Sequence, residues 1–178
     1  MINALRMRPD RIIVGEVRGG EALDMIQAIN TGHPGSMTTL HANSPEDAFA
    51  RLETMLRMAR EGADLPEAAL RRMICAFNLV VQVARLVDGT RKVIRIDEVV
   101  GVQENLIRTE PIYVFRPVGT AEDEERVRGY FAATGYRPAL CLRRLEEHGV
   151  TWSPDLFDPQ PRIWVEGERW IQAPEEEA

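Results

Sequence analysis

Lysine is almost absent from this sequence. Of 22 basic residues only Lys92 is a lysine, and it stands in "TRKVIRID" with no glycine-rich loop beside it. A phosphate-binding loop of the form G-x-x-x-x-G-K-[ST] needs its lysine to neutralise charge on the β- and γ-phosphates. The 178 residues therefore contain no complete loop of this kind.

Cysteines and long apolar runs are also scarce. Cys75 and Cys141 stand alone, outside any CxxC pair, so neither a disulfide framework nor a zinc knuckle is indicated. No apolar run approaches the roughly 20 residues that cross a bilayer, and "MINALRMRPD" lacks the apolar segment of a secretory signal. We expect a cytoplasmic globular protein, since 44% apolar residues suffice for one core.

Positive charge is not in excess. The formal net charge is −6, and "EEE" at 175–177 supplies half of it from a segment that we expect to be a solvated tail. The sequence therefore lacks the excess positive charge that favours DNA binding, and RNA-binding and helix-turn-helix signatures are also absent. We expect no nucleic-acid partner.

The first 42 residues alternate between strand and helix patterns. "RIIVG" (11–15) is typical of a strand buried on both faces, "EALDMIQAIN" (21–30) has a helical apolar stripe, and "SMTTLHA" (36–42) predicts a second strand. In a strand–helix–strand unit the carboxyl ends of the parallel strands share one edge, where open α/β sheets bind ligands. We therefore expect Glu16, after the first strand, and His41, at the end of the second, to converge on one crevice.

Later segments predict two helices and then antiparallel strands. "NSPEDAFARLETMLRMAR" (43–60) opens with Ser44 as cap and an acid in the capping-box position, and another helix starts at Pro66. Asp88-Gly89 joins two apolar runs and is a strong hairpin signal, and "PIYVFRP" (111–117) predicts a further strand. The fold class is α/β, a parallel sheet with an antiparallel hairpin extension.

We divide the chain into three parts on these patterns. Residues 1–116 form the main domain, 117–150 a small helical extension around "PALCLRRLEEHG", and 151–178 a tail rich in proline, tryptophan and acid. "GTAEDEER" (119–126) predicts a charged loop.

The polar residues of the first quarter permit several interpretations. Glu16 has the place where P-loop NTPases keep the group that orients the attacking water. Taken alone, the commoner interpretation is a strand-end glutamate that pairs with Arg18 or is solvated. His41 fits a phosphate sensor, but a strand-end histidine that bonds neighbouring backbone is as common, and His33, in a Gly-Pro-Gly turn, fits a surface role.

Other chemistries lack their patterns. His33 and His41 do not have the helical spacing of a zinc protease, so we expect no metal ligands among the site residues. No G-x-S-x-G elbow occurs, and "GEVRGG" does not have the glycine spacing of a dinucleotide fingerprint.

A longer stretch is more specific than its parts. "RMRPDRIIVGEVRGGEALDMIQAINTGHPGSMTTLHANSPEDAFARLETM" closely resembles the Walker B and His-box region of the secretion ATPase superfamily, the motors of type II and type IV secretion and of type IV pili. "LRMRPDRIIVGEVRG" and "NTGHPGSMTTLHANSPEDA" are most similar to the CpaF/TadA branch, which drives assembly of Flp-type pili. The resemblance covers about 150 residues, and it implies the C-terminal part of a RecA-like P-loop ATPase domain.

The resemblance also implies residue roles. Glu16 would be the catalytic glutamate that activates water, and His41 would contact the γ-phosphate of ATP. Gly15 stands where other P-loop enzymes have a Walker B aspartate, so Mg²⁺ would be held through water and the nucleotide. Four residues would be nucleotide-binding or supporting: Arg18, His33, Thr38 and Thr39.

The missing phosphate loop is the main departure from this superfamily. Its members place that loop upstream, so we interpret this chain as the C-terminal portion of a motor and expect it to be inactive alone. The intact protein would be a homo-oligomer, a hexameric ring that works with platform proteins at the cytoplasmic face of the inner membrane. A non-catalytic binding module that docks on a full-length motor is the alternative, and a DNA translocase of the same fold is a third.

Overall fold

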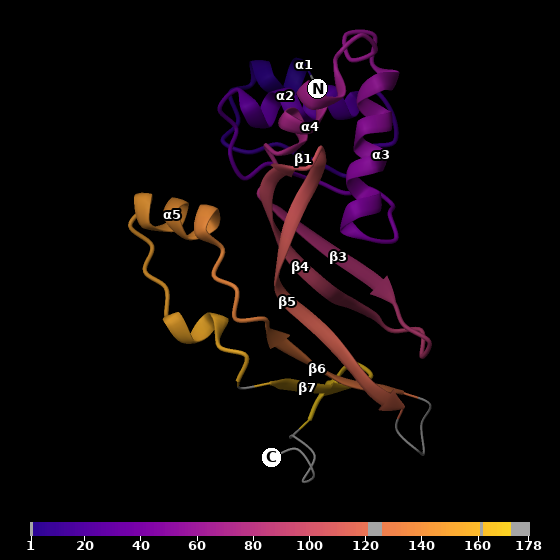
Figure 1. Ribbon diagram of the computed structural model, residues 1–178, viewed down its shortest axis with the longest axis vertical. Coiled ribbons are helices and arrows are strands. Elements are labelled where there is room, and N and C mark those ends of the chain that lie inside the picture. Colours follow the sequence, from indigo (N-terminus) through magenta and orange to yellow (C-terminus); the bar gives the residue numbers. More distant parts are fainter. Residues whose placement is uncertain (1, 121–125, 161, 172–178) are drawn as a thin grey trace. The chain divides into compact units, whose positions relative to one another are not determined.

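The computed structural model describes residues 2–120, 126–160 and 162–171 (Figure 1). They fall into two compact units. The first consists of residues 1–78 and 99–109, and the second of residues 79–98 and 110–178.

The first unit contains the predicted strand–helix–strand motif. After helix α1 (Ile2–Arg6), strand β1 (Ile13–Val14) pairs in parallel with β2 (Met37–Thr38). Both strands are shorter than the patterns suggested, and the predicted burial on both faces is wrong, because Ile13 is 71% exposed. Among the described residues β1 has only β2 as a strand neighbour, so no further layer covers that side chain.

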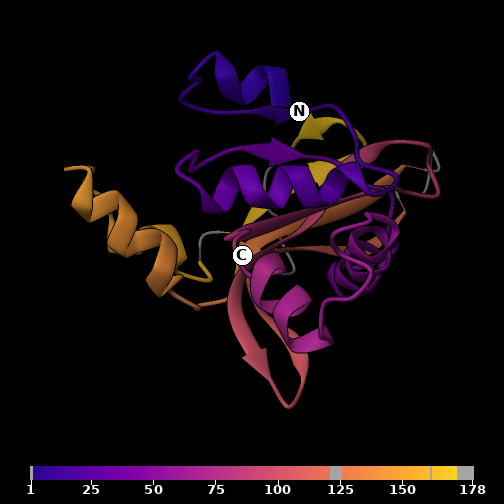
Figure 2. The same ribbon diagram turned by 90° about the horizontal axis from the view of Figure 1, so that it is seen from above.

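Three helices make the core of this unit. Helices α2 (Glu21–Asn30), α3 (Pro45–Met58) and α4 (Glu67–Ile74) pack against one another (Figure 2). The side chains that they bury completely are apolar: Met25, Ile26, Met55, Leu56, Leu70 and Ile74. The apolar stripes in the sequence therefore predicted the inner faces of these helices.

Helix α3 begins as the sequence predicts. The Ser44 Oγ accepts a hydrogen bond of 3.1 Å from the backbone N–H of Asp47, and Pro45 is the first helical residue. This bond satisfies one of the N–H groups that have no partner within the helix.

Loss of this cap has a measurable cost. We expect Ser44→Ala to lower the free energy of unfolding by about 1 kcal/mol, because the Asp47 N–H loses its acceptor. Urea unfolding followed by circular dichroism measures this change. Ser44→Asp keeps an acceptor and serves as the control, and equal stability of all three proteins would contradict the capping role.

The remaining strands form one six-stranded sheet in sequence order. The strands are β3 (Leu79–Arg85), β4 (Arg91–Gln103), β5 (Leu106–Thr120), β6 (Val127–Ala133), β7 (Ile163–Glu166) and β8 (Arg169–Trp170). The predicted Asp88-Gly89 turn joins β3 to β4, with Gly89 at φ +81° and the Asp88 carboxylate accepting from the Thr90 N–H at 3.0 Å. The fold is α/β, with parallel and antiparallel strands as predicted.

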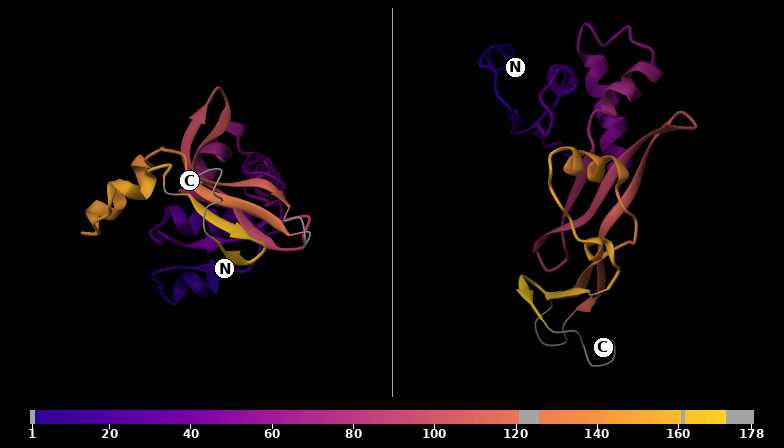
Figure 3. Two further views of the ribbon diagram at one scale, coloured as in Figure 1. Left: turned by 90° about the horizontal axis from the view of Figure 1, so that it is seen from below. Right: turned by 90° about the vertical axis from the view of Figure 1, so that its left-hand side faces the viewer.

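The C-terminal part contains more strand than its sequence suggested. The expected helix is present as α5 (Ala139–Glu147), but β6 also falls within the predicted helical extension. The predicted tail continues through the 3-10 helix η1 (Pro154–Phe157) into β7 (Figure 3). The acidic run at 175–177 lies outside the described residues, as do residues 121–125 of the predicted charged loop. Within the described part of the chain, no helix is long and apolar enough to cross a membrane.

Two buried charged residues organise the second unit. The Glu98 carboxylate, fully buried, accepts hydrogen bonds from the Tyr136 hydroxyl at 2.7 Å and from the Cys141 N–H, in the first turn of α5, at 2.9 Å. It replaces a local cap, since Pro138 at the cap position has no side-chain donor or acceptor. Lys92, 8% exposed, donates to the Gly167 carbonyl and lies 5.9 Å from the centre of the Phe115 ring.

The same contacts suppress the reactivity of Cys141. Burial and then the hydrogen bond to the Glu98 carboxylate raise the pKa of the thiol to about 11. Because the thiolate is the nucleophile, we expect maleimide at pH 8 to label Cys141 at least about tenfold more slowly than free N-acetylcysteine. Peptide mass spectrometry measures this rate, which should rise as pH approaches the raised pKa. Labelling as fast as that of the free thiol would contradict the assignment.

Candidate functional site

The backbone after β1 is held to the backbone after β2. The Val17 N–H donates to the Thr39 carbonyl at 3.0 Å, and the Thr39 hydroxyl donates to the Gly15 carbonyl at 2.5 Å. Glu16 lies between these two bonds, so Thr39 fixes its backbone on both sides. The side chain of Thr39 thus has a structural reason to be a threonine, since a hydroxyl is needed to reach Gly15.

Two basic side chains meet the Glu16 carboxylate. Arg18 Nη2 lies 2.8 Å from Oε2, and His41 Nε2 lies 3.1 Å from Oε1. The predicted convergence of Glu16 and His41 is confirmed, and so is the pairing of Glu16 with Arg18. Oε1 is buried and has no hydrogen-bond donor among the described residues, because the His41 ring is close but not directed along a hydrogen bond.

Exposure differs sharply within this cluster. The Glu16 side chain is 26% exposed, whereas those of Arg18 and His41 are 74% and 79% exposed. The carboxylate is therefore a fixed, partly shielded group, and both basic side chains reach solvent.

Charge keeps Glu16 ionised. The hydrogen bond from Arg18 is the largest influence, and it lowers the pKa of the Glu16 carboxyl. Burial acts in the opposite direction, and electrostatic interactions with Arg18, His41 and Arg51 lower the pKa further. Glu16 in turn raises the pKa of the Arg18 guanidinium. The site therefore holds one carboxylate beside the guanidinium groups of Arg18 and Arg51.

The loop after Glu16 has its own anchor. The Glu21 carboxylate, at the start of α2, accepts from the backbone N–H of Arg18 at 2.6 Å and of Gly19 at 3.0 Å. These bonds, led by that from Arg18, lower the pKa of the Glu21 carboxyl. Gly20 follows, and a side chain here would meet the Ala59 backbone at 3.0 Å.

Glu21 and Arg51 were missed in the sequence. An acid in the first turn of a helix that follows two glycines was the available signal for Glu21. No signal in the sequence indicated Arg51, because the effect of Arg51 on Glu16 depends on how α3 is placed in the first unit.

The other predicted residues have local partners. The His33 Nδ1 lies 3.1 Å from the Ala28 carbonyl, so its ring is bound to the end of α2 and not to Glu16. The Thr38 hydroxyl donates to the Thr39 carbonyl at 3.4 Å. No contact assigns either residue to the Glu16 cluster.

The cluster fits one end of a phosphate chain. The exposed Arg18 guanidinium and His41 ring suit a terminal phosphoryl group, and the undonated Oε1 of Glu16 can accept from a water molecule. Among the described residues no three His, Cys, Asp or Glu side chains form a metal-binding group.

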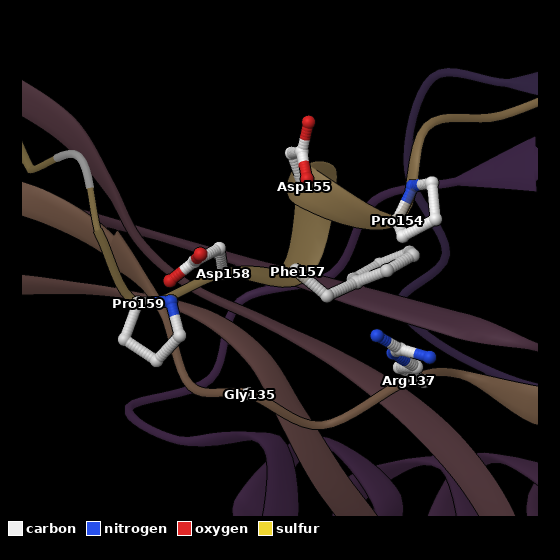
Figure 4. Close-up of a pocket in the computed structure, with 7 residues that line it drawn as sticks. All are labelled: Gly135, Arg137, Pro154, Asp155, Phe157, Asp158 and Pro159. Atoms are coloured by element: carbon white, nitrogen blue, oxygen red, sulfur yellow. The ribbon is translucent and has the colours of Figure 1, made fainter.

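A separate cavity lies wholly in the second unit. It has a volume of about 280 Å³ and is bordered by Gly135, Arg137, Pro154, Asp155, Phe157, Asp158 and Pro159. Figure 4 shows the Asp155 carboxylate pointing away from the Arg137 guanidinium. None of the predicted site residues lines it, and one arginine among carboxylates defines no ligand.

The family follows from comparison with known proteins. Residues 1–132 match the family described as "Type II/IV secretion system protein". The chain belongs to this family of secretion ATPases, and the matched residues include both β1 and β2.

Particular relatives are similar over the same region. The chain is 45% identical over 94 residues to a putative conjugal transfer protein of Mycobacterium tuberculosis, which is 52% of this chain and 26% of that protein. It is 39% identical over 109 residues to the conjugal transfer protein TrbB of Rhizobium radiobacter, covering 61% of this chain and 32% of that protein. The chain thus spans about a quarter to a third of the curated relatives that it matches.

A solved structure supports the fold. The VirB11 ATPase of the Brucella suis type IV secretion system, in complex with sulphate, matches with a TM-score of 0.50 and 41% identity. The match covers 53% of this chain and 30% of that one. The fold is accordingly that of the C-terminal part of such an ATPase domain.

Proposed function

We propose that this chain supplies the glutamate and histidine side of an ATP-hydrolysing site in a secretion motor. The observation that carries the proposal is the contact between Glu16, after β1, and His41, after β2. The family supports it, since its members include an ATPase of a type IV secretion system.

Each side chain has a role in this proposal. Glu16 accepts the proton of the attacking water through a carboxylate oxygen, and His41 contacts the γ-phosphate. Thr39 holds the Glu16 backbone, and Arg18 supplies positive charge beside it. Bound Mg²⁺ would neutralise phosphate charge and would be held by the nucleotide and water, since Gly15 offers no side-chain ligand.

The rest of the phosphate site comes from residues outside these 178. We propose that they include a P-loop, and that the intact motor is a hexameric ring on the cytoplasmic face of the inner membrane. Sequence similarity to the CpaF/TadA branch supports pilus assembly as its task. The names of the curated relatives, conjugal transfer and type IV secretion proteins, support transport through related machinery.

The DNA upstream of the Met1 codon tests this proposal. We expect a G-x-x-x-x-G-K-[ST] segment there, in frame or one frameshift away, and ATP hydrolysis by the longer protein. A complete upstream sequence that encodes no such segment in any frame would overturn it.

A second function rests on the missing P-loop. The chain would then be a binding module that docks on a full-length motor and does not bind nucleotide appreciably by itself. Calorimetric titration with ATP tests the module, because tight binding by the 178-residue chain rules it out.

A further inference from the structure

One oxygen of the carboxylate that should activate water is already engaged by Arg18. A general base must offer an oxygen lone pair to the water that it deprotonates. In the structure Glu16 Oε2 lies 2.8 Å from Arg18 Nη2, and His41 Nε2 stands 3.1 Å from Oε1. In this arrangement the Arg18 guanidinium, which suits a phosphoryl group, is in contact with the base instead.

The Arg18 side chain can exchange Glu16 for another hydrogen-bond acceptor. Its backbone N–H is fixed by Glu21 at 2.6 Å, while its side chain is 74% exposed and touches Glu16 with its far end. Rotation of a long exposed side chain costs little free energy, whereas Thr39 holds the backbone of Glu16 on both sides. The movable member of the pair is therefore the arginine.

A phosphoryl group is the natural competitor of Glu16. A planar guanidinium binds carboxylate and phosphate with the same fork of N–H donors. A terminal phosphate carries up to two negative charges and three acceptor oxygens, against one charge and two oxygens on Glu16. Arg51 adds positive charge near the same point and favours the more highly charged anion.

We propose that Arg18 is a latch that closes on Glu16 in the absence of ligand and transfers to a phosphoryl oxyanion, together with His41, when one arrives. The transfer frees Oε2 for water. This inference rests on the proposed function and adds a positioning role: Arg18 occupies Oε2 until phosphate is present.

The electrostatics of the pair agree with this order of events. The Arg18 hydrogen bond is the largest influence that lowers the pKa of the Glu16 carboxyl, so its loss raises the basicity of Glu16. The carboxylate thus becomes a better proton acceptor at the moment when the phosphate is in place.

Competition for inorganic phosphate tests the latch in the 178-residue chain itself. Nuclear magnetic resonance of the His41 ring follows phosphate binding in four proteins: wild type, E16Q, R18Q and the double variant. We expect E16Q to bind phosphate roughly two- to fivefold more tightly than wild type, because the pair that must open is an exposed one. R18Q should bind more weakly than wild type.

The double variant separates a latch from simple charge removal. If Arg18 transmits the effect, E16Q gives no gain in the R18Q background. R18K, which keeps the charge, should retain part of the gain, and Glu61→Gln, a surface carboxylate on the same unit, should have none. An equal gain from E16Q in both backgrounds, or no phosphate binding in E16Q, overturns the proposal.

Failure of the latch is distinguishable from failure of the proposed function. The comparison of inorganic phosphate binding by the four proteins does not involve ATP, whereas the proposed function depends on an upstream P-loop and on ATP hydrolysis. Thermal unfolding of each variant, monitored by circular dichroism, confirms that the comparison is made between folded proteins.

Discussion

Replacing Glu16 by glutamine, in a form of this protein that carries a P-loop, lowers kcat for ATP hydrolysis by about 10²- to 10⁴-fold. Glutamine has the shape of glutamate and keeps an acceptor for Arg18, which bonds Glu16 at 2.8 Å. It cannot take the proton of the attacking water. The KM for ATP should change much less, since the lost interaction belongs to the chemical step. A coupled assay of ADP release measures both constants.

A matched control accompanies this variant. Glu61, an exposed residue after α3, can be changed to glutamine with the same loss of charge. Glu61→Gln should hydrolyse ATP within about twofold of wild type, because surface substitutions away from such features have small effects. Hydrolysis by the Glu16→Gln variant at the wild-type rate refutes the assigned role.

Replacing Glu98 by alanine lowers the free energy of unfolding by about 2–4 kcal/mol. The Glu98 carboxylate is the acceptor for both the Tyr136 hydroxyl and the Cys141 N–H, and Ala leaves both donors without this partner. Burial and the Glu98 carboxylate raise the pKa of the Tyr136 hydroxyl, so the group stays protonated and needs its acceptor. Denaturant unfolding followed by tyrosine and tryptophan fluorescence measures the loss.

Two controls define the cause. Glu98→Gln retains one amide oxygen and should lose less stability than Glu98→Ala. Glu147→Ala removes an exposed carboxylate at the end of α5 and should change stability by about 0.5 kcal/mol or less. If Glu98→Ala and Glu147→Ala are equally stable, the buried carboxylate does not anchor α5.

Local features of the fold could be predicted from the sequence. The Ser44 cap, the stripe of α2 and the Asp88-Gly89 turn depend on residues a few positions apart, and the structure has all three. The convergence of Glu16 and His41 needed one further step, the parallel pairing of a strand–helix–strand unit. The roles of these residues remain predictions.

Contacts between distant segments could not be predicted. Strand β7 was placed in a tail because proline and tryptophan dominate that segment, yet Phe131 of β6 pairs with Ile163, 32 positions further on. Likewise "GVQENLIRT" (101–109) gave no turn signal, although Glu104 and Asn105 both have positive φ between β4 and β5. Non-local pairing decides these elements, and a single sequence does not encode it in a short pattern.

The burial of Lys92 determines how this protein can be attached to other molecules. It is the only lysine of the chain, and its ammonium group is bonded to the Gly167 carbonyl beneath the surface. Amine-directed dyes, cross-linkers and resins therefore find no accessible lysine within these 178 residues. By the same reasoning, enzymes that acylate lysine reach Lys92 only when the second unit unfolds.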